Sequence, residues 1–158
     1  MTSTGQIERE TQNRIVRLFK EQLGYRYLGN WEERGGSNIE EEELRKYLTA
    51  TKKYSKELID KAVYELSKTA GNQSESLYDI NKAVYLMLRY GVKVRPEAGA
   101  NTETIEVINW KDWNKNDFAI AEEVTVKGEH HKRPDIVLYI NGIAIGIIEL
   151  KRSTISIS

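Results

Sequence analysis

Apolar residues recur at helical spacing through the first 90 residues. A first amphipathic helix is predicted over 5–23, with Ile15 and Phe19 near one face and Gly24 as a plausible stop. A polar helical region follows at 39–48, and two further helices are predicted over 55–69 and 76–90. Glycine-containing stretches separate these segments, and a short aromatic run at 25–31 is either a strand or an ordered loop.

The pattern changes to strands after Gly91. Short apolar or alternating runs predict strands at 92–94, 104–108, 118–126, 136–140 and 143–150. Asn141-Gly142 joins the last two runs, and this dipeptide strongly favours a tight hairpin. Both runs are apolar at nearly every position, so we expect both strands to be central in a sheet. Helices followed by a mixed sheet predict an α/β or α+β domain.

Composition narrows the class of protein. With 158 residues, 39% of them hydrophobic and 30% charged, the chain is typical of one globular domain, residues 1–158. It has no cysteine, which excludes disulfides and thiolate metal sites, and no apolar run long enough to span a membrane. A cytoplasmic protein is the expectation. The formal net charge is zero, which suggests that any bound DNA is delivered by other domains or subunits.

The predicted hairpin carries the candidate chemistry. Asp135 precedes its first strand, and Glu149 and Lys151 end its second. Residues i and i+2 of a strand share a face, so Glu149 and Lys151 point the same way. A two-residue turn at Asn141-Gly142 places Asp135 opposite Ile148, next to Glu149. Two carboxylates and an ammonium group are therefore expected at one end of the hairpin.

Such a cluster suits phosphodiester hydrolysis. Asp135 and Glu149 offer hard oxygen ligands for Mg²⁺, and Mn²⁺ can substitute for it. Lys151 can orient a water molecule and neutralise charge that develops on the phosphate. A Glu-x-Lys sequence alone is common on solvated strand ends. Pro134-Asp135 and the flanking isoleucine-rich strands are what favour the functional interpretation.

At these residues the chain resembles the PD-(D/E)xK nuclease core. More narrowly, it is similar to the N-terminal nuclease domain of the R (HsdR) subunit of type I restriction enzymes. The segments that carry the resemblance are 133–142 and 147–151, together with Leu23-Gly24-Tyr25, Arg89-Tyr90-Gly91-Val92, Ile108-Asn109-Trp110 and Asn116-Asp117-Phe118. The resemblance implies a restriction-endonuclease-like fold, a central mixed sheet flanked by helices.

The resemblance also implies a function. Such subunits cut duplex DNA with Mg²⁺ after ATP-driven translocation, and they act with methyltransferase (M) and specificity (S) subunits. This chain lacks a phosphate-binding loop, so ATP would enter only through motor domains that are absent here. It also ends before the Gln-x-x-x-Tyr element that usually follows the lysine strand. We therefore expect an N-terminal fragment of a longer subunit, and whether it cuts DNA by itself stays open.

The resemblance to PD-(D/E)xK nucleases also implies a further acidic residue from the first helix. Glu8 lies about 20° from Ile15 on a helical wheel and Glu10 on the opposite side, which favours Glu8, although a solvated carboxylate stays an alternative. Gln12, one turn further on, is a candidate for positioning phosphate or water. Basic candidates for DNA phosphate are Lys132, Arg133 and Arg152, while His130 and His131 are interpreted as loop residues.

Two alternatives to the endonuclease stay open. One is a non-catalytic DNA-associated or docking domain with a degenerate nuclease fold, against which the intact Asp135, Glu149 and Lys151 argue. The other is a different PD-(D/E)xK nuclease, such as a repair nuclease or junction resolvase. The long helical stretch at 40–90 argues against a minimal resolvase.

Overall fold

The computed structural model of the chain describes residues 3–34, 36–125 and 133–151, with side chains from Glu8 onward. The chain forms two compact units. Unit 1 comprises Met1–Ser37, Phe118–Tyr139 and Ala144–Ser158, and unit 2 comprises Asn38–Asp117 and Ile140–Ile143. Each unit is built from segments that are distant in the sequence.

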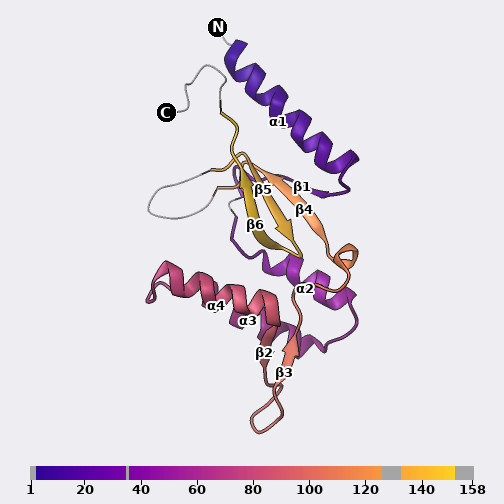
Figure 1. Cartoon of the computed structure of the whole chain (residues 1–158), viewed down its shortest axis with the longest axis vertical. Helices are drawn as coiled ribbons and strands as arrows, with labels where there is room; N and C mark the ends of the chain where they lie inside the picture. The colour runs from indigo at the N-terminus through magenta and orange to yellow at the C-terminus, as the bar shows by residue number, and fades with distance from the viewer. Residues whose placement is uncertain (1–2, 35, 126–132, 152–158) are drawn as a thin grey trace. The chain divides into compact units, whose positions relative to one another are not determined.

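Unit 1 is built on one helix and a sheet (Figure 1). The helix is α1 (Ser3–Glu21), and the strands are β1 (Arg26–Asn30), β4 (Phe118–Glu122), β5 (Ile136–Ile140) and β6 (Ile143–Ile148). The strand order is β1-β4-β5-β6, and β1 runs parallel to β4 with Arg26 opposite Ala119. Because β5 and β6 are joined by a tight hairpin, the sheet is mixed. The α/β class is thereby confirmed, and the aromatic run at 25–31 contains a strand.

The two faces of this sheet are covered differently. On the α1 face, Val16 packs against Ile120 and Ile136, with partly buried Phe19 and Leu138 around them. The other face carries a second apolar cluster of Leu28, Trp31, Ala119, Ala121, Val124, Val137, Tyr139 and Ala144. Alternate residues of β4 and β5 thus serve opposite faces, as the period of two along a strand requires. Both faces of these two strands are buried, which holds the end of the sheet rigidly.

The expectation that both hairpin strands are central is wrong for β6. Among the named strands of the described residues β6 is the last, next to β5, and its Ile143 forms an isolated antiparallel bridge with Ile39. Ile145 and Ile147, which share one face of β6, are 52% and 63% exposed, so this face is not buried either. The apolar composition of the run indicates neither whether another strand pairs beside β6 nor whether the face that carries Ile145 and Ile147 is covered. The prediction holds for β5, whose residues are almost all buried.

The hairpin turn is the tight turn that Asn141-Gly142 predicts. Both residues have positive φ, 52° and 83°, as a type I′ turn requires. Asn141 is fully buried, and its Oδ1 accepts a hydrogen bond from the backbone N of Asp117 at 2.7 Å. Its Nδ2 donates to the carbonyl of Val107 at 2.8 Å and to Oδ1 of Asn116 at 2.9 Å. The register of the hairpin is therefore held by side-chain bonds as well as by the turn.

Unit 2 contains α2 (Glu41–Ala50), α3 (Lys56–Ala70), α4 (Leu77–Tyr90), the 3-10 turn η1 (Trp113–Lys115) and two short strands, β2 (Val92–Val94) and β3 (Glu103–Ile105). The hydroxyls of Ser55 and Ser76 cap α3 and α4 by accepting hydrogen bonds from Leu58 N and Asp79 N. Strands β2 and β3 pair antiparallel. The helix and strand predictions for this region are confirmed to within a few residues.

The three tryptophans differ in environment. Trp31 is buried against Tyr139 in unit 1, with ring centroids 5.7 Å apart, and belongs to the core. Trp110 and Trp113 of unit 2 are more than half exposed. Among the described residues, no helix combines the length and the apolar character needed to cross a membrane.

Candidate active site

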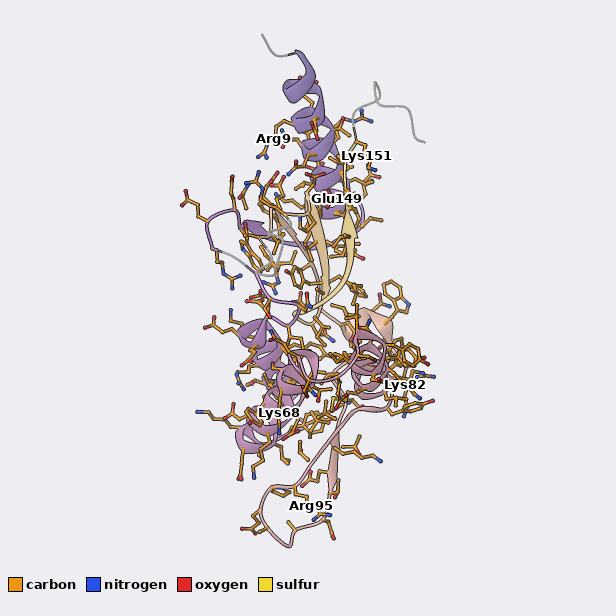
Figure 2. The ribbon with its side chains drawn as sticks, turned by 90° about the vertical axis from the view of Figure 1, so that its left-hand side faces the viewer. Arg9, Lys68, Lys82, Arg95, Glu149 and Lys151 are labelled. Atoms are coloured by element: carbon orange, nitrogen blue, oxygen red, sulfur yellow. The ribbon has the colours of Figure 1, made fainter. Side chains whose placement is uncertain are left out.

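Asp135 lies beside the Glu149-Leu150-Lys151 segment. Its Oδ2 accepts a hydrogen bond from the backbone N of Leu150 at 2.5 Å. Leu150 is flanked in sequence by Glu149 and Lys151, and both of these side chains are exposed. Figure 2 shows Glu149 and Lys151 together at the end of unit 1 where α1 lies. The structure therefore brings the two halves of the sequence motif together at one end of the hairpin, as the predicted register requires.

The second half of the motif lies just outside the strand. β6 ends at Ile148, two residues earlier than the predicted end at Leu150. Glu149 and Lys151 therefore follow the strand, where their side chains have access to solvent. A metal ligand and a lysine that act on a DNA backbone need such access.

A second polar cluster lies at the same end of the sheet, at the end of β4. We call Gln12, Tyr27, Glu122 and Glu123 the Gln12 cluster. Gln12 Nε2 donates to Oε1 of Glu122 at 2.9 Å and to Oε1 of Glu123 at 3.2 Å. The Tyr27 hydroxyl donates to Oε2 of Glu122 at 2.5 Å. Both oxygens of the buried Glu122 carboxylate are thus satisfied, which is the condition for burying such a group.

Backbone contact joins this cluster to the motif. The backbone N of Glu123 donates to the carbonyl of Asp135 at 3.0 Å, so the end of β4 lies against the start of β5. Glu123 itself has a positive φ of 52°. This conformation ends the regular strand directly beside Asp135.

Two arginines surround Glu123. Arg133 donates from Nε to Oε2 of Glu123 at 3.0 Å and also pairs with Glu32. Arg9 of α1 approaches Oε1 of Glu123 more loosely, at 3.9 Å. Both arginine side chains stay about half exposed. They are held near the motif and still have guanidinium surface available to a phosphate group.

The environment of Tyr27 changes its acidity. Burial, then the hydrogen bond to Glu122 and the charge of that carboxylate, raise the pKa of Tyr27 from 10.0 to about 12, and the charge of Arg9 opposes the rise. The hydroxyl therefore stays protonated to a higher pH than an ordinary tyrosine and remains a donor to Glu122 over that range.

The acidic candidates from the first helix have different exposure. Glu8 is half-buried and Glu10 is exposed, which agrees with the helical-wheel argument. In the part of the chain that the structure describes, no three acidic or histidine side chains are grouped closely enough to hold a metal ion together. Asp135 and Glu149 offer two carboxylates. That number suits Mg²⁺, which is usually held by one or two carboxylates plus water and substrate phosphate.

Of the other predicted site residues, some lie within the described part of the chain and some lie outside it. Gln12 is 3% exposed and its amide binds the two glutamates, an arrangement that the sequence did not suggest. Arg133 lies beside the motif, as expected from its position. Lys132 and Arg152, with His130 and His131, lie outside the described residues.

Sequence reasoning missed Glu122, Glu123 and Tyr27. The available signal was weak: two adjacent acids directly after four apolar or small residues of a strand, at a position where a buried strand would otherwise continue. Gln12, the partner of Glu122 on α1, is 110 residues away in the sequence, and no local pattern indicates such a contact.

Known proteins are similar to this chain over most of its length. A family model described as the type I restriction enzyme R protein N terminus matches residues 5–158. Two putative type I restriction enzyme endonuclease subunits of Methanocaldococcus jannaschii are 33% identical over 82% of the chain and 29% identical over 67%. The HindI endonuclease subunit of Haemophilus influenzae is 26% identical over 70% of the chain. The chain spans only 11–13% of the length of these relatives. Since the family model covers nearly every residue, the chain belongs to the family of type I restriction enzyme R protein N termini.

Proposed function

We propose that this chain is the nuclease domain of a type I restriction enzyme and hydrolyses phosphodiester bonds of duplex DNA with Mg²⁺. The observation that carries the proposal is the bond from Leu150 N to Asp135 Oδ2, which brings Asp135 next to Glu149 and Lys151. Relatives named as endonuclease subunits support the proposal, and so does the family model, whose match includes these residues.

Asp135 and Glu149 would hold the metal ion, with Glu8 of α1 as a third acidic contributor. When bound, Mg²⁺ polarises the scissile phosphate and makes a coordinated water molecule a better nucleophile. Lys151 donates hydrogen bonds to the attacking water and to a phosphate oxygen, and its charge offsets the negative charge that develops there. These are groups that strengthen their interactions as the reaction proceeds, which is what catalysis requires.

The basic side chains near the motif would bind the DNA backbone. Arg133 has its guanidinium partly exposed while Glu123 orients it, so it can contact a phosphate next to the metal. Lys132 and Arg152, adjacent in sequence to the motif, are proposed for the same role. The zero net charge fits a domain that receives DNA from other parts of an assembly.

We propose that the partners are the methyltransferase and specificity subunits of the restriction complex, and that ATP acts through motor domains of the endonuclease subunit. A second candidate is a docking domain without catalysis. It is favoured by one observation, that the described residues do not gather three acidic side chains.

Plasmid cleavage by the assembled complex distinguishes these candidates. The variants are Asp135→Ala and Lys151→Ala in the complete endonuclease subunit, with Asp112→Ala, an exposed acid of unit 2, as the matched control. Both site variants should lose Mg²⁺-dependent cleavage while ATP hydrolysis continues, and the control should cleave normally. Cleavage at the wild-type rate by both site variants would refute the proposed function and support the docking domain.

A further inference from the structure

The buried carboxylate of Glu122 joins three elements of unit 1. It lies at the end of β4, accepts a hydrogen bond from Gln12 of α1 and accepts another from Tyr27 of β1. Gln12 and Glu122 are only 3% and 4% exposed. Burying an ionisable group costs free energy even when it is hydrogen-bonded, and an apolar residue would fill the same space. A requirement other than packing therefore accounts better for a carboxylate at this position.

This contact lies next to the proposed metal site. The neighbouring residue, Glu123, donates its backbone N–H to the carbonyl of Asp135. The Asp135 side chain in turn accepts from Leu150 N, between Glu149 and Lys151. A short path of hydrogen bonds and backbone thus connects Glu122 to both halves of the motif.

The same contact orients the first helix. Glu8 lies one turn before Gln12, and residues i and i+4 of a helix share a face. When Glu122 and Glu123 hold the Gln12 amide, the rotation of α1 about its own axis is restricted. The contact therefore fixes α1 against the end of β4 that lies beside Asp135.

We propose that Glu122 is a positioning residue for DNA cleavage: with Gln12 it holds the end of β4, whose Glu123 N–H binds the Asp135 carbonyl, so that Asp135 stays in place at the metal site. The inference rests on the proposed function. Tyr27 supports the arrangement by donating to the second oxygen of Glu122, which keeps the carboxylate from rotating away from Gln12.

The test replaces the contact by apolar side chains of similar size. Glu122→Leu and Gln12→Leu are placed singly and together in the complete endonuclease subunit within its complex. Glu40→Leu removes another buried carboxylate, in unit 2, and is the matched control. The readouts are the Mg²⁺ concentration for half-maximal plasmid cleavage, the rate of ATP hydrolysis and the melting temperature.

The expected result is an increase of about tenfold in the half-maximal Mg²⁺ concentration for each single variant, the size typical of lost support around a metal ligand. The double variant should show no larger increase, because either substitution alone already removes the bond between Gln12 and Glu122 through which the proposed positioning acts. Glu40→Leu should leave the Mg²⁺ dependence unchanged.

Two outcomes would overturn the positioning role. One is a wild-type Mg²⁺ dependence for Glu122→Leu, and the other is additive effects in the double variant. If Glu122→Leu does not fold, Tyr27→Phe removes one hydroxyl and should still raise the half-maximal Mg²⁺ concentration; no increase would overturn the proposal. Asp135→Ala distinguishes failure of the positioning role from failure of the proposed function. If Asp135→Ala loses cleavage while Glu122→Leu keeps the wild-type Mg²⁺ dependence, only the positioning role is refuted. If Asp135→Ala cleaves normally, the proposed function is refuted.

Discussion

Asn141→Ala should destabilise the chain strongly, because this side chain holds the hairpin turn. The substitution removes three hydrogen bonds of 2.7, 2.8 and 2.9 Å from a fully buried position. Each such bond contributes about 1 kcal/mol net, and more where a buried partner is left unsatisfied. Alanine must also adopt the positive φ of 52°, at a further cost of about 1–2 kcal/mol.

These effects give an expected loss of about 4 kcal/mol in the free energy of unfolding. The corresponding fall in melting temperature for a chain of this size is about 10 °C. Urea denaturation followed by far-ultraviolet circular dichroism measures the first quantity, and thermal denaturation the second. Asn101→Ala, at an exposed position, is the matched control and should change the stability by less than about 0.5 kcal/mol.

A third variant separates the two causes. Asn141→Gly loses the same three hydrogen bonds but accepts a positive φ without strain, so it should be more stable than Asn141→Ala by about 1 kcal/mol. An Asn141→Ala chain that unfolds at the wild-type urea concentration would refute the role of the hydrogen bonds. Equal stabilities of the alanine and glycine variants would refute the contribution of the backbone conformation.

Three other substitutions test the fold and its pH dependence. Gly142→Ala places a Cβ 2.8 Å from backbone atoms of α2 and its cap, whereas a Cβ at Gly99, which also has a positive φ, would have nothing within 4 Å. Thermal denaturation should show a loss in the free energy of unfolding of several kcal/mol for Gly142→Ala and of about 1 kcal/mol for Gly99→Ala. Because the pKa of Tyr27 rises from 10.0 to about 12 on folding, its contribution to stability is complete below pH 10 and is lost as the pH rises toward 12. Urea midpoints should therefore fall less steeply between pH 10 and 12 in Tyr27→Phe than in the wild type, and equal slopes would contradict the assignment. Ile147→Lys, on the exposed face of β6, should lower the free energy of unfolding by less than about 0.5 kcal/mol. A larger loss in urea denaturation would mean that this face is covered.

The parts of the fold that depend on local patterns could be predicted from the sequence. Serine caps, helical spacing and the Asn141-Gly142 turn act over a few residues, so the helices and the hairpin were found with nearly their observed bounds. The register of the hairpin then placed Asp135 beside Glu149, and the bond to Leu150 agrees with that placement.

The parts of the fold that depend on residues distant in the sequence could not be predicted from the sequence. The outer position of β6 depends on what does or does not pair beside it, and its isoleucines look like those of a central strand. The bond between Gln12 and Glu122 joins residues 110 positions apart, so no periodicity indicated it. Gln12 was expected at a phosphate or water, and the structure instead shows its amide bound to two glutamates.

Calorimetric titration of this chain with Mn²⁺ tests most directly whether Asp135 and Glu149 together hold a divalent metal ion. We expect binding whose affinity falls at least about tenfold in both Asp135→Ala and Glu149→Ala, and stays at the wild-type value in Asp112→Ala. Equal affinities for the wild type and both site variants, or no binding by the wild-type chain, would contradict this expectation.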